Sequence, residues 1–361
     1  MHTQYRVGII GCGRVAKMHL MGWRALKNVD VVAAADINKE VAENFCKQYN
    51  VPKSYTDYKE MITREDLDII SICTWPSSHA EITIEAAKLG VKGILCEKPM
   101  CLSLAEADAM IRACEENGVK LAIGHQHRFD PQNVLARELV KEEVIGKPYL
   151  IVCRTRDGLL NNGTHYIDLM RYWLGDPKTE WVIGQVERKT DRFENRFERG
   201  SPIEDLCMGL ICFENGTRGL IEVDLPDDRI PWEPTIYGSN GVMIITQGKV
   251  LILNDKEKGW QIIEAPPQKD TEFSEMIDWI EGRREHRCNA YQARYTMEIM
   301  MAIYESARTH SLIRMPLKTK ENPLFMMIRS GQLPVVKPGR YDIRLPKSMW
   351  KDLKMPWEVK H

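Results

Sequence analysis

Long apolar runs, an excess of charge of one sign and paired cysteines are all missing from this 361-residue sequence. No apolar stretch approaches the roughly 20 residues that a membrane-spanning helix needs. A formal net charge of -1 gives no electrostatic reason to expect a nucleic acid or an anionic membrane surface as a partner. We therefore expect neither nucleic-acid binding nor membrane association.

The 10 cysteines do not follow the paired spacing of a metal motif. They are scattered, mostly within apolar segments, as at Cys73, Cys96, Cys153, Cys207 and Cys212. Reduced core thiols in a cytoplasmic protein account for this usage most simply, and we expect no metal site. The N-terminal stretch MHTQYRVGII lacks a basic segment followed by an apolar one, so we expect no signal peptide. The length itself predicts about two domains.

A glycine-rich turn follows the first predicted strand, residues 5–10, and precedes a helix that reaches about residue 26. Its pattern is G-x-G-x-x-A, formed by Gly11, Gly13 and Ala16. The first glycine permits the tight turn, the second lets the backbone approach a pyrophosphate, and the helix N-terminus faces the phosphates. We assign to cofactor binding Gly11, Cys12, Gly13, Arg14 and Val15.

Asp36 ends a second apolar strand, residues 31–35. An acid in this place accepts hydrogen bonds from an adenosine ribose and repels a 2′-phosphate, which favours NAD over NADP. We include the next residue, Ile37, in the cofactor site. Asp36 also suits the N-cap of a helix that starts near Asn38, and both roles are compatible.

Strands and helices continue to alternate, which predicts a parallel, doubly wound sheet. The expected strands cover residues 68–73, 93–96 and 119–124, and the expected helices cover residues 77–89, with Ser77 or Ser78 as N-cap, and 103–117, with a Ser103–Glu106 capping box.

Two loops follow strands of this sheet. In the first, Thr74, Trp75, Pro76 and His79 are assigned to the cofactor, with Trp75 placed to stack on the nicotinamide or its ribose. The alternative is that Trp75 only covers the sheet end and His79 only caps a helix.

The second loop belongs to the stretch GILCEKPM, residues 93–100, in which Glu97, Lys98 and Pro99 follow a short apolar strand. A partly desolvated lysine at the carboxyl end of a strand suits proton transfer. The alternative is a strand that ends in a turn with two solvated charges. The Lys98–Pro99 bond has a low intrinsic penalty for the cis form.

Together with CTWPSSHAEI, GILCEKPM and GVKLAIGHQHRFDP, the G-x-G-x-x-A start resembles the Gfo/Idh/MocA family, which includes glucose–fructose oxidoreductase and inositol dehydrogenase. The resemblance extends from Arg6 to about Arg308. It implies an α/β protein with an N-terminal Rossmann domain and a C-terminal α+β domain that has a large, mostly antiparallel, open-faced sheet. It also implies a nicotinamide cofactor and a sugar or polyol substrate. For Lys98 it implies contact with both the cofactor ribose and the reacting hydroxyl. Relatives often have the Lys-Pro bond cis beside the cofactor, so we expect Lys98–Pro99 to be cis. We also assign Glu97 and Gln126 to the cofactor.

Further polar residues follow residue 124. His125 and His127 point to opposite faces if the chain is extended, which argues against a metal, whereas Arg128 suits a polar substrate. Arg154 and Arg156, near the end of an expected strand at residues 149–155, suit an acidic substrate or are surface charges.

The segment from Asn161 to Asp168 begins a helix that is expected to reach about residue 174. The resembled family reads D-x-G-x-H-x-x-D here, with the first Asp and the His serving catalysis. His165 and Asp168 match, but Asn161 stands where the first Asp is expected. An amide holds a hydroxyl but cannot take a proton, so proton transfer is left to His165 and Lys98. We assign Asn161 and His165 to catalysis and substrate binding, and Asp168 to the substrate. If the resemblance is set aside, His165 is also consistent with an ordinary histidine, satisfied by its own hydrogen bonds, at the start of a helix.

The remaining chain predicts a hairpin at residues 206–213 and 218–223, then strands near 236–237, 242–246, 250–253 and 260–263, and helices near 271–282 and 290–309. The strand at 206–213 is apolar on both faces, which predicts a homodimer or homotetramer packed through the sheet. We expect domains at residues 1–126 and 127–312. The extension at residues 313–361, with Trp350 and Trp357, is expected to pack on its own or a partner's surface.

We interpret the sequence as an NAD-dependent oxidoreductase that converts a secondary alcohol of a sugar, sugar derivative or inositol to a ketone, or the reverse. Lys98 and His165 would handle the proton while hydride passes to nicotinamide C4. One alternative is a glycoside-cleaving enzyme that uses NAD for transient oxidation and elimination. The other is a non-catalytic NAD-binding regulatory protein.

Overall fold

The computed structural model describes residues 4–193, 201–224 and 233–342. The chain forms two compact units, and the first consists of two separate segments, Met1–Phe129 and Pro267–Arg294. The second unit comprises Asp130–Pro266 and Tyr295–His361. The sequence placed residues 127–312 in one domain, whereas the contacts return residues 267–294 to the first unit.

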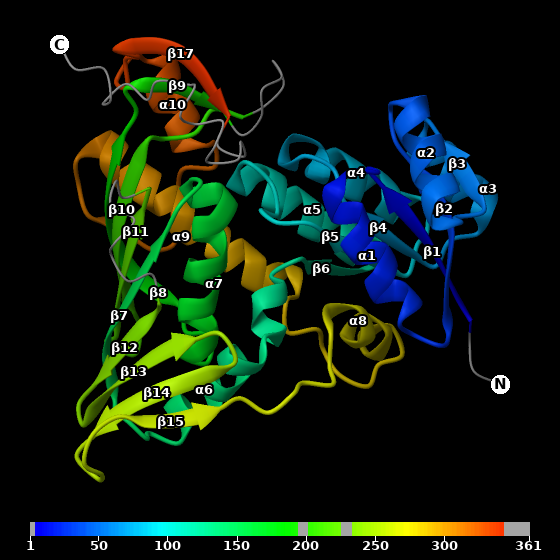
Figure 1. Ribbon diagram of the computed structural model, residues 1–361. Helices are drawn as coiled ribbons and strands as arrows, with labels where there is room; N and C mark the ends of the chain where they lie inside the picture. The colour runs from blue at the N-terminus through cyan, green and yellow to red at the C-terminus, as the bar shows by residue number, and fades with distance from the viewer. Residues whose placement is uncertain (1–3, 194–200, 225–232, 343–361) are drawn as a thin grey trace. The chain divides into compact units, whose positions relative to one another are not determined.

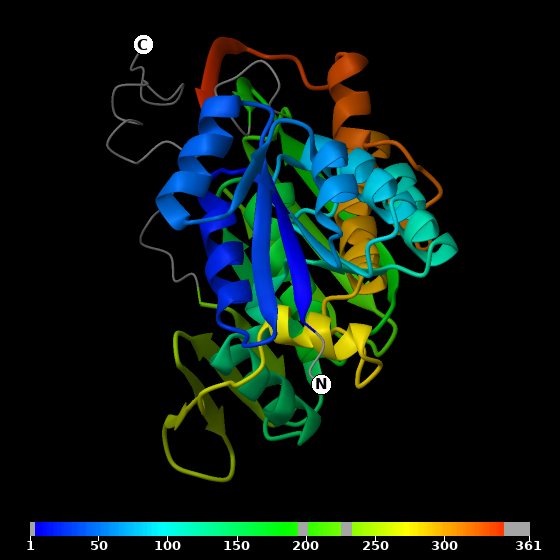
Figure 2. The same cartoon turned by 90° about the vertical axis from the view of Figure 1, so that its right-hand side faces the viewer.

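The first unit is a parallel sheet of six strands in the order β3-β2-β1-β4-β5-β6, with helices around it (Figures 1 and 2). Its elements are β1 (Tyr5–Ile10), α1 (Arg14–Arg24), β2 (Val29–Ala35), α2 (Lys39–Tyr49), β3 (Lys53–Tyr55), α3 (Tyr58–Glu65), β4 (Ile69–Ile72), α4 (Pro76–Lys88), β5 (Gly93–Cys96), α5 (Leu104–Glu116), β6 (Lys120–Ile123), a 3₁₀ turn (Gln126–Phe129) and α8 (Glu272–Ile280). This strand order is that of a dinucleotide-binding Rossmann sheet, so the predicted doubly wound sheet is confirmed. The strand expected as the third is β4, because β3 and α3 precede it.

Strands β4 and β5 are buried along their whole length, as their apolar sequences IISI and GILC require in a sheet covered on both faces. Helix α4 begins at Pro76 with Trp75 as its N-cap and has no side-chain cap, so the prediction of Ser77 or Ser78 is wrong. Proline suits this first helical position because its φ is already fixed there. The Ser103 hydroxyl caps α5 as predicted, but the Glu106 carboxylate accepts from Leu102 N–H, so the expected capping box is only half formed.

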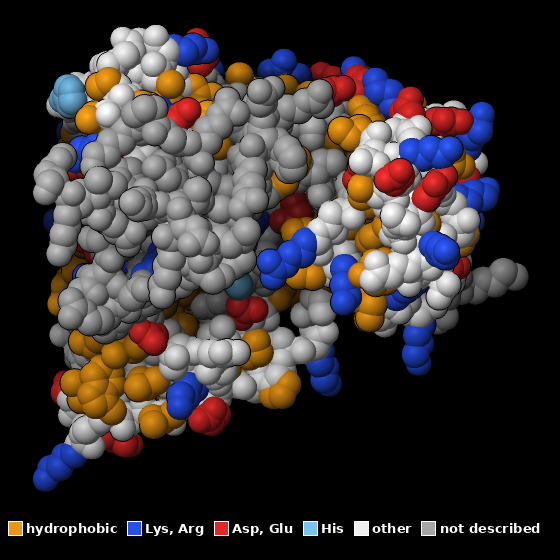
Figure 3. Space-filling view, turned by 45° about the horizontal axis from the view of Figure 1, so that its top comes forward, with side chains coloured by type: hydrophobic (Ala, Val, Ile, Leu, Met, Phe, Trp, Pro, Cys, Tyr) orange, Lys and Arg blue, Asp and Glu red, His pale blue; other side chains and the backbone are white. Residues whose placement is uncertain are grey.

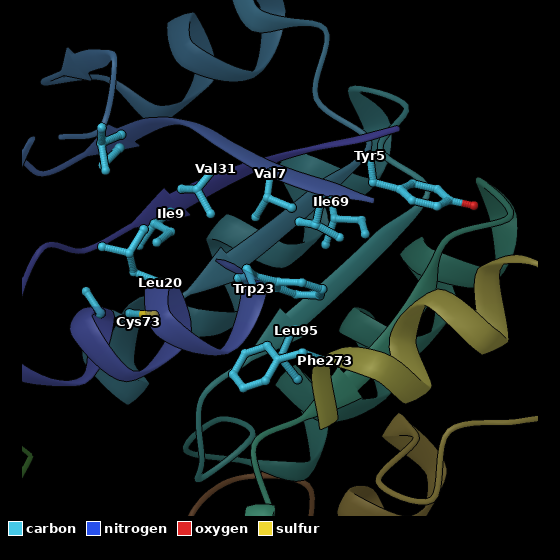
Figure 4. Close-up of a cluster of buried hydrophobic side chains, with 14 of the residues drawn as sticks. Tyr5, Val7, Ile9, Leu20, Trp23, Val31, Ile69, Cys73, Leu95 and Phe273 are labelled. Carbon is cyan, nitrogen blue, oxygen red and sulfur yellow. The ribbon is translucent and has the colours of Figure 1, made fainter. Parts of the chain in front are cut away.

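Helix α8 packs into the core of the first unit, although it lies far along the chain from the sheet. The Phe273 ring packs edge to face on the Trp23 ring, with 5.0 Å between the ring centroids, and lies in one hydrophobic cluster with Leu95 (Figure 4). Two glycines make room for this helix. A Cβ at Gly22 would lie 2.0 Å from the Phe273 ring, and one at Gly93 would lie 2.9 Å from the Met276 sulfur.

The second unit contains a nine-stranded sheet in the order β15-β14-β13-β12-β7-β11-β10-β8-β16. Its elements are α6 (Pro131–Lys141), β7 (Pro148–Thr155), a π turn (Leu159–Gly163), α7 (Thr164–Trp173), β8 (Thr179–Glu187), β9 (Thr190–Phe193), β10 (Leu206–Phe213), β11 (Arg218–Val223), β12 (Thr235–Gly238), β13 (Gly241–Thr246), β14 (Lys249–Asn254), β15 (Gln261–Glu264), α9 (Ala290–Thr309), β16 (Ile313–Arg314), α10 (Pro323–Arg329) and β17 (Lys337–Asp342). The pairing of β7 with β11 is parallel, and the other pairings in this sheet are antiparallel. The large, mostly antiparallel sheet is therefore confirmed.

Helices α7 and α9 cover one face of this sheet (Figure 1). A Cβ at Gly219 of β11 would lie 2.8 Å from Met170 of α7, and one at Gly184 of β8 would lie 2.5 Å from the Ile303 carbonyl of α9. Side chains at the alternate strand positions point to the opposite face, which we call the open face.

The open face carries a row of side chains that the strand register aligns across the sheet. Its members come from eight neighbouring strands, β8 to β15 in sheet order, and are Ile183, Leu210, Leu220, Val152, Thr235, Ile244, Leu251 and Ile262. Ile183 and Ile262, near the two ends of the row, are 43% and 58% exposed. Figure 3 shows hydrophobic side chains at the surface in the region where Figure 1 places β12 to β15.

The extension after residue 312 begins as part of the second unit. Strand β16 pairs with β8, helix α10 buries Leu324 and Met327, and β17 pairs with β9 in a parallel ribbon. Trp350 and Trp357 lie outside the described residues.

Within the described residues, no helix has the length and apolar character to cross a membrane, and no group of three His, Cys, Asp or Glu residues forms a metal site. All ten cysteines are buried and free.

Candidate functional site

The glycine turn has the shape that a pyrophosphate needs. Gly11 has φ +89°, and a Cβ there would lie 2.8 Å from the Cys73 carbonyl, so only glycine fits without strain. Nothing lies within 4 Å of a Cβ built on the exposed Gly13, which is the N-cap of α1 and offers no capping side chain. The first turn of α1 thus presents backbone N–H groups to a phosphate. Arg14 is exposed beside this turn, and Val15 is half-buried.

Asp36 is fixed at the tip of β2 by two backbone donors. Its carboxylate accepts from Cys12 N–H at 2.9 Å and from Asn38 N–H at 2.9 Å. Asn38, and not Asp36, is the N-cap of α2, since its side chain accepts from two N–H groups of the first turn. Asp36 is half-buried next to the glycine turn, and the adjacent Ile37 is 86% exposed.

The loop after β4 is tied to the loop after β5 by His79. The ring is fully buried, with Nδ1 3.0 Å from the Pro99 carbonyl and Nε2 3.1 Å from the Thr74 carbonyl. Burial lowers the pKa of His79. His79 thus holds the two loops together from beneath and does not lie on the cofactor surface, whereas Trp75 is 46% exposed.

Lys98 directly follows β5, at the same sheet edge as the glycine turn and Asp36. The Lys98–Pro99 bond is cis, as predicted. The neighbouring Glu97 carboxylate is directed inward, with Oε1 2.9 Å from Nε2 of His19 on α1 and Oε2 accepting from Lys98 N–H at 3.1 Å. Glu97 was expected to bind the cofactor, but its carboxylate is engaged with His19.

The segment after β6 contains two of the predicted site residues, Arg128 and Gln126, and their surroundings differ. Arg128 is 1% exposed and donates to the Arg287 carbonyl at 3.0 Å, so it joins two segments of the first unit and is not exposed to a substrate. Gln126 has a buried Oε1 that meets no hydrogen-bond donor within the described part of the chain. An acceptor of this kind suits an amide such as that of nicotinamide.

His165 lies in the first turn of α7, directly after the π turn. It is 6% exposed, and Asp168, one turn later, is 1% exposed and accepts from the Thr296 hydroxyl at 3.2 Å. Asn161 lies within the π turn, where Gly163 N–H bonds to the Gly158 carbonyl. Asn161 and His165 are therefore not joined by a continuous α-helical turn.

Two carboxylates, the buried Glu204 and the half-buried Asp224, hold the start of this π turn. Glu204 accepts from Leu159 N–H at 2.5 Å and from the Tyr304 hydroxyl at 2.8 Å, and burial raises its pKa. Asp224 accepts from the N–H groups of Asp157 and Gly158, at 2.8 and 2.9 Å. These residues escaped the sequence analysis, because carboxylates near strand ends carry no distinctive spacing.

Arg154 lies on the open face of the sheet, the face opposite to α7. The alternation of β7 buries Ile151 and Cys153 on the helix side, and Arg154 pairs with Glu222 at 2.6 Å on the other side. The structure therefore does not bring Arg154 to His165. Arg156 lies just after β7 and is half-buried.

Glu272, the first residue of α8, is a further group that the sequence analysis missed. It is 8% exposed, and its Oε2 has no hydrogen-bond partner within the described ranges. Burial raises its pKa to about 7, with the Glu97 charge adding to the effect and His19 and His127 opposing it. Acidic residues at helix starts usually serve as first-turn charges, which is why this position gave no signal.

The comparisons with known proteins agree with this arrangement. The family model for the GFO/IDH/MocA oxidoreductase family, NAD-binding Rossmann fold, matches residues 5–125, and the model for the family's C-terminal alpha/beta domain matches residues 158–317. The chain therefore belongs to the Gfo/Idh/MocA oxidoreductase family and has an NAD-binding Rossmann domain, as the sequence predicted.

Individual relatives are more distant. The uncharacterized oxidoreductase YrbE of Bacillus subtilis (strain 168) is 30% identical over 236 residues, 62% of this chain and 67% of the relative. Myo-inositol 2-dehydrogenase of Thermotoga maritima is 29% identical over 189 residues, 48% of this chain and 56% of the relative. The chain thus spans little more than half to two thirds of the length of these relatives. A solved levoglucosan dehydrogenase, in complex with NADH and levoglucosan, has a TM-score of 0.77 at 20% identity and covers 87% of this chain and 100% of that one, which shows the shared fold.

Proposed function

Because the chain is a Gfo/Idh/MocA oxidoreductase, we propose that it is an NAD-dependent dehydrogenase that acts on a secondary alcohol of a sugar, a sugar derivative or an inositol. The observation that carries this proposal is the position of Lys98 directly after β5, at the sheet edge that also holds the glycine turn and Asp36. Ligands of open α/β sheets bind at this carboxyl edge. The dehydrogenase names of relatives support the substrate class.

The residues of the first unit fit NAD. The first turn of α1 would hold the pyrophosphate, and Asp36 would accept from the adenosine ribose. Trp75 and the Gln126 amide would lie near the nicotinamide half. When bound, NAD supplies the hydride acceptor at nicotinamide C4.

The residues of the protein itself handle the proton of the substrate hydroxyl. The carbinol carbon gives up a hydride and its hydroxyl gives up a proton, so that a ketone, NADH and a proton are formed, and the reverse reaction uses the same groups. We assign the hydroxyl proton to Lys98 and His165, and the holding of substrate hydroxyls to Asn161, with Arg156 for an acidic substrate. Arg128 and Asp168 are left out because each is only 1% exposed, and Arg154 because it lies on the open face of the sheet, opposite to α7.

The test is NADH formation by the purified protein over a panel of myo-inositol, levoglucosan, free sugars and sugar acids, with NAD and with NADP. Lys98→Ala should lower kcat by roughly 10²–10⁴ and leave NADH binding nearly unchanged, since it removes an acid–base group. His165→Ala should do the same, and the double variant should lose less than the product of the two effects. Lys92→Ala is the matched control, because Lys92 precedes the same strand at its other end and pairs with Asp68 at 2.6 Å. Near-normal turnover of Lys98→Ala would show that Lys98 does not transfer the hydroxyl proton.

Asn161 favours a second candidate, a glycosidase that oxidises its substrate transiently and then eliminates the aglycone. NAD would be regenerated within each cycle, so no net redox change would occur. Release of the aryl alcohol from an aryl glycoside without accumulation of NADH would support this candidate. NADH formation in proportion to ketone, with intact aryl glycoside, would support the dehydrogenase.

We also propose that a second copy of the chain covers the open face of the nine-stranded sheet. Eight strands at about 4.8 Å spacing give an apolar row roughly 34 Å wide. Three side-chain rows of that width approach the roughly 800 Å² per partner of a standard protein interface. Two such sheets can pack face to face, so a homodimer or homotetramer is expected.

The location that we propose is the cytoplasm. All ten cysteines are free and buried, and a reducing compartment keeps thiols in that state. Cell fractionation with an antibody against the chain tests this, and recovery outside the cytoplasmic fraction would contradict it.

A further inference from the structure

A buried ion pair lies beneath Lys98. His19 of α1 and Glu97 after β5 are 78 positions apart in the sequence, and their side chains meet at 2.9 Å between Nε2 and Oε1. The His19 side chain is 1% exposed and the Glu97 side chain is 13% exposed. His19 belongs neither to the loop after β4 nor to the loop after β5. It is one of the buried residues of α1, which face the core.

The His19 ring is fixed on its other sides as well. Nδ1 lies 3.0 Å from the Ser71 hydroxyl of β4, and that hydroxyl also accepts from the Trp23 indole N–H at 2.7 Å. Phe273 of α8 meets the ring edge to face at 5.6 Å. Three elements of the first unit therefore determine the position of the imidazole.

The carboxylate of Glu97 joins this fixed ring to Lys98. Oε2 accepts from Lys98 N–H at 3.1 Å, while Oε1 is bound by His19. Gly124 of the loop after β6 lies against the same carboxylate, since a Cβ built there would be 3.4 Å from Oε1. The backbone that carries the Lys98 side chain is thus attached through one carboxylate to the core of the sheet.

Each of the two side chains favours the charged form of the other. Burial alone would raise the pKa of Glu97, but the hydrogen bond and charge of His19 and the charge of Lys98 outweigh it and lower that pKa. Burial also opposes protonation of His19, but the neighbouring Cys73 and Glu97 raise its pKa above the ordinary value. A buried ion pair is often no more stabilising than apolar residues of the same volume, so stability alone does not explain this one.

We propose that His19 and Glu97 are positioning residues for Lys98. In this role Glu97 holds the Lys98 backbone and keeps a fixed negative charge next to its ammonium, and His19 keeps that carboxylate in place. The inference rests on the proposed function of Lys98 as the proton-handling group. It explains why Glu97 faces the core at a position where the sequence pointed to a cofactor ligand.

Other titratable groups surround the carboxylate and enter any titration of the site. From the elements packed against it these are Cys73 after β4, His79 of α4, Cys96 of β5 and Glu272 of α8. The variants below keep all four side chains. The charges of His19 and Glu97 act on Glu272 and Cys73, so the response of these two groups is part of any measured shift.

The test measures the protonation of Lys98 itself. Lysines are dimethylated reductively with ¹³C-formaldehyde, which keeps their charge, and the Lys98 resonance is identified by its absence in Lys98→Arg. Glu97→Gln keeps an acceptor for the backbone N–H but removes the charge, and should lower the titration midpoint of Lys98 by about one pH unit. His19→Gln should raise the midpoint, because the carboxylate then acts on Lys98 without its cation. The double variant His19→Gln/Glu97→Gln leaves no unpaired buried charge and should lower the midpoint as Glu97→Gln does, so it serves if a single variant does not fold.

The matched control is His286→Gln, since His286 is equally buried in the same unit but binds the Glu272 carbonyl. It should leave the Lys98 midpoint unchanged. A midpoint that stays within about 0.2 units in both Glu97→Gln and the double variant would overturn the proposal, as would an equal shift in the control. The titration needs no substrate. If no compound of the substrate panel were turned over, the proposed function would be weakened, but the effect of Glu97 and His19 on the titration of Lys98 would still hold. With an active substrate, His19→Gln should lower kcat about tenfold with little change in KM, a split expected of a positioning residue.

Discussion

Glu272 should make the stability of the protein depend on pH, and the isosteric change Glu272→Gln should remove that dependence. The carboxyl is 8% exposed, its Oε2 has no partner within the described residues, and burial raises its pKa to about 7 from an ordinary 4.5. The N-terminus of α8 and the nearby His19 and His127 favour the ionised form, but burial and the charge of Glu97 outweigh them.

The sign follows from proton binding. Between pH 4.5 and about 7 the folded protein holds the Glu272 proton and the unfolded chain releases it, so stability falls as the pH rises through this window. A difference of about 2.5 pKa units at about 1.36 kcal/mol per unit gives a loss of roughly 3 kcal/mol, complete above pH 7. Glutamine is neutral at every pH and resembles the protonated acid in shape. Glu272→Gln should therefore match the unmodified protein near pH 4.5 and exceed its stability by up to roughly 3 kcal/mol near pH 8.

The assay is urea unfolding of both proteins, followed by tryptophan fluorescence, at several pH values between 4.5 and 8. Taking the difference between the two proteins at each pH cancels the other titrating groups. Glu285→Gln is the control, because Glu285 is exposed and lies in the same segment of the first unit, Pro267–Arg294. The difference in free energy of unfolding between Glu285→Gln and the unmodified protein should not change with pH. A constant difference for Glu272→Gln, or one that grows toward low pH, would show that Glu272 is ionised in the folded protein and that burial does not dominate.

Three further outcomes are expected. Asp36→Ala should shift binding from NADH toward NADPH in fluorescence titrations, since it removes the repulsion of a 2′-phosphate, and equal binding of both by the unmodified protein would contradict the role of Asp36. Asn161→Asp should be tolerated or should raise dehydrogenase turnover, and a loss of more than about tenfold would mean that the reaction requires the amide. Leu210→Lys, on β10 within the open face, should lower the mass seen by light scattering, whereas Glu214→Lys in the adjoining turn should not, and a monomeric unmodified protein would contradict the proposed assembly.

The sequence predicted the parallel sheet because its central strands are apolar on both faces and are spaced by helices. It missed β3, whose three residues KSY are polar and mostly exposed. It also left α8 in the second domain, because chain order was the only guide. One sign of this packing was Gly22, a glycine in the last turn of α1, where it weakens the helix by up to roughly 1 kcal/mol relative to alanine. That glycine makes room for Phe273, 251 positions later, and only the folded structure shows which residue needs the space.

The charged residues of the candidate site show most clearly what a sequence leaves open. Lys98 directly follows β5, Arg128 lies in the 3₁₀ turn after β6 and Arg154 lies within β7, and each was a reasonable ligand for a polar substrate. The structure separates them through partners that are remote in sequence, with 159 positions between Arg128 and the Arg287 carbonyl and 68 between Arg154 and Glu222. A buried charge needs such a partner, since an unpaired one costs several kcal/mol. The same requirement joins His19 to Glu97, and through Glu97 it attaches the Lys98 backbone to the core, where the proposed chemistry needs a fixed lysine.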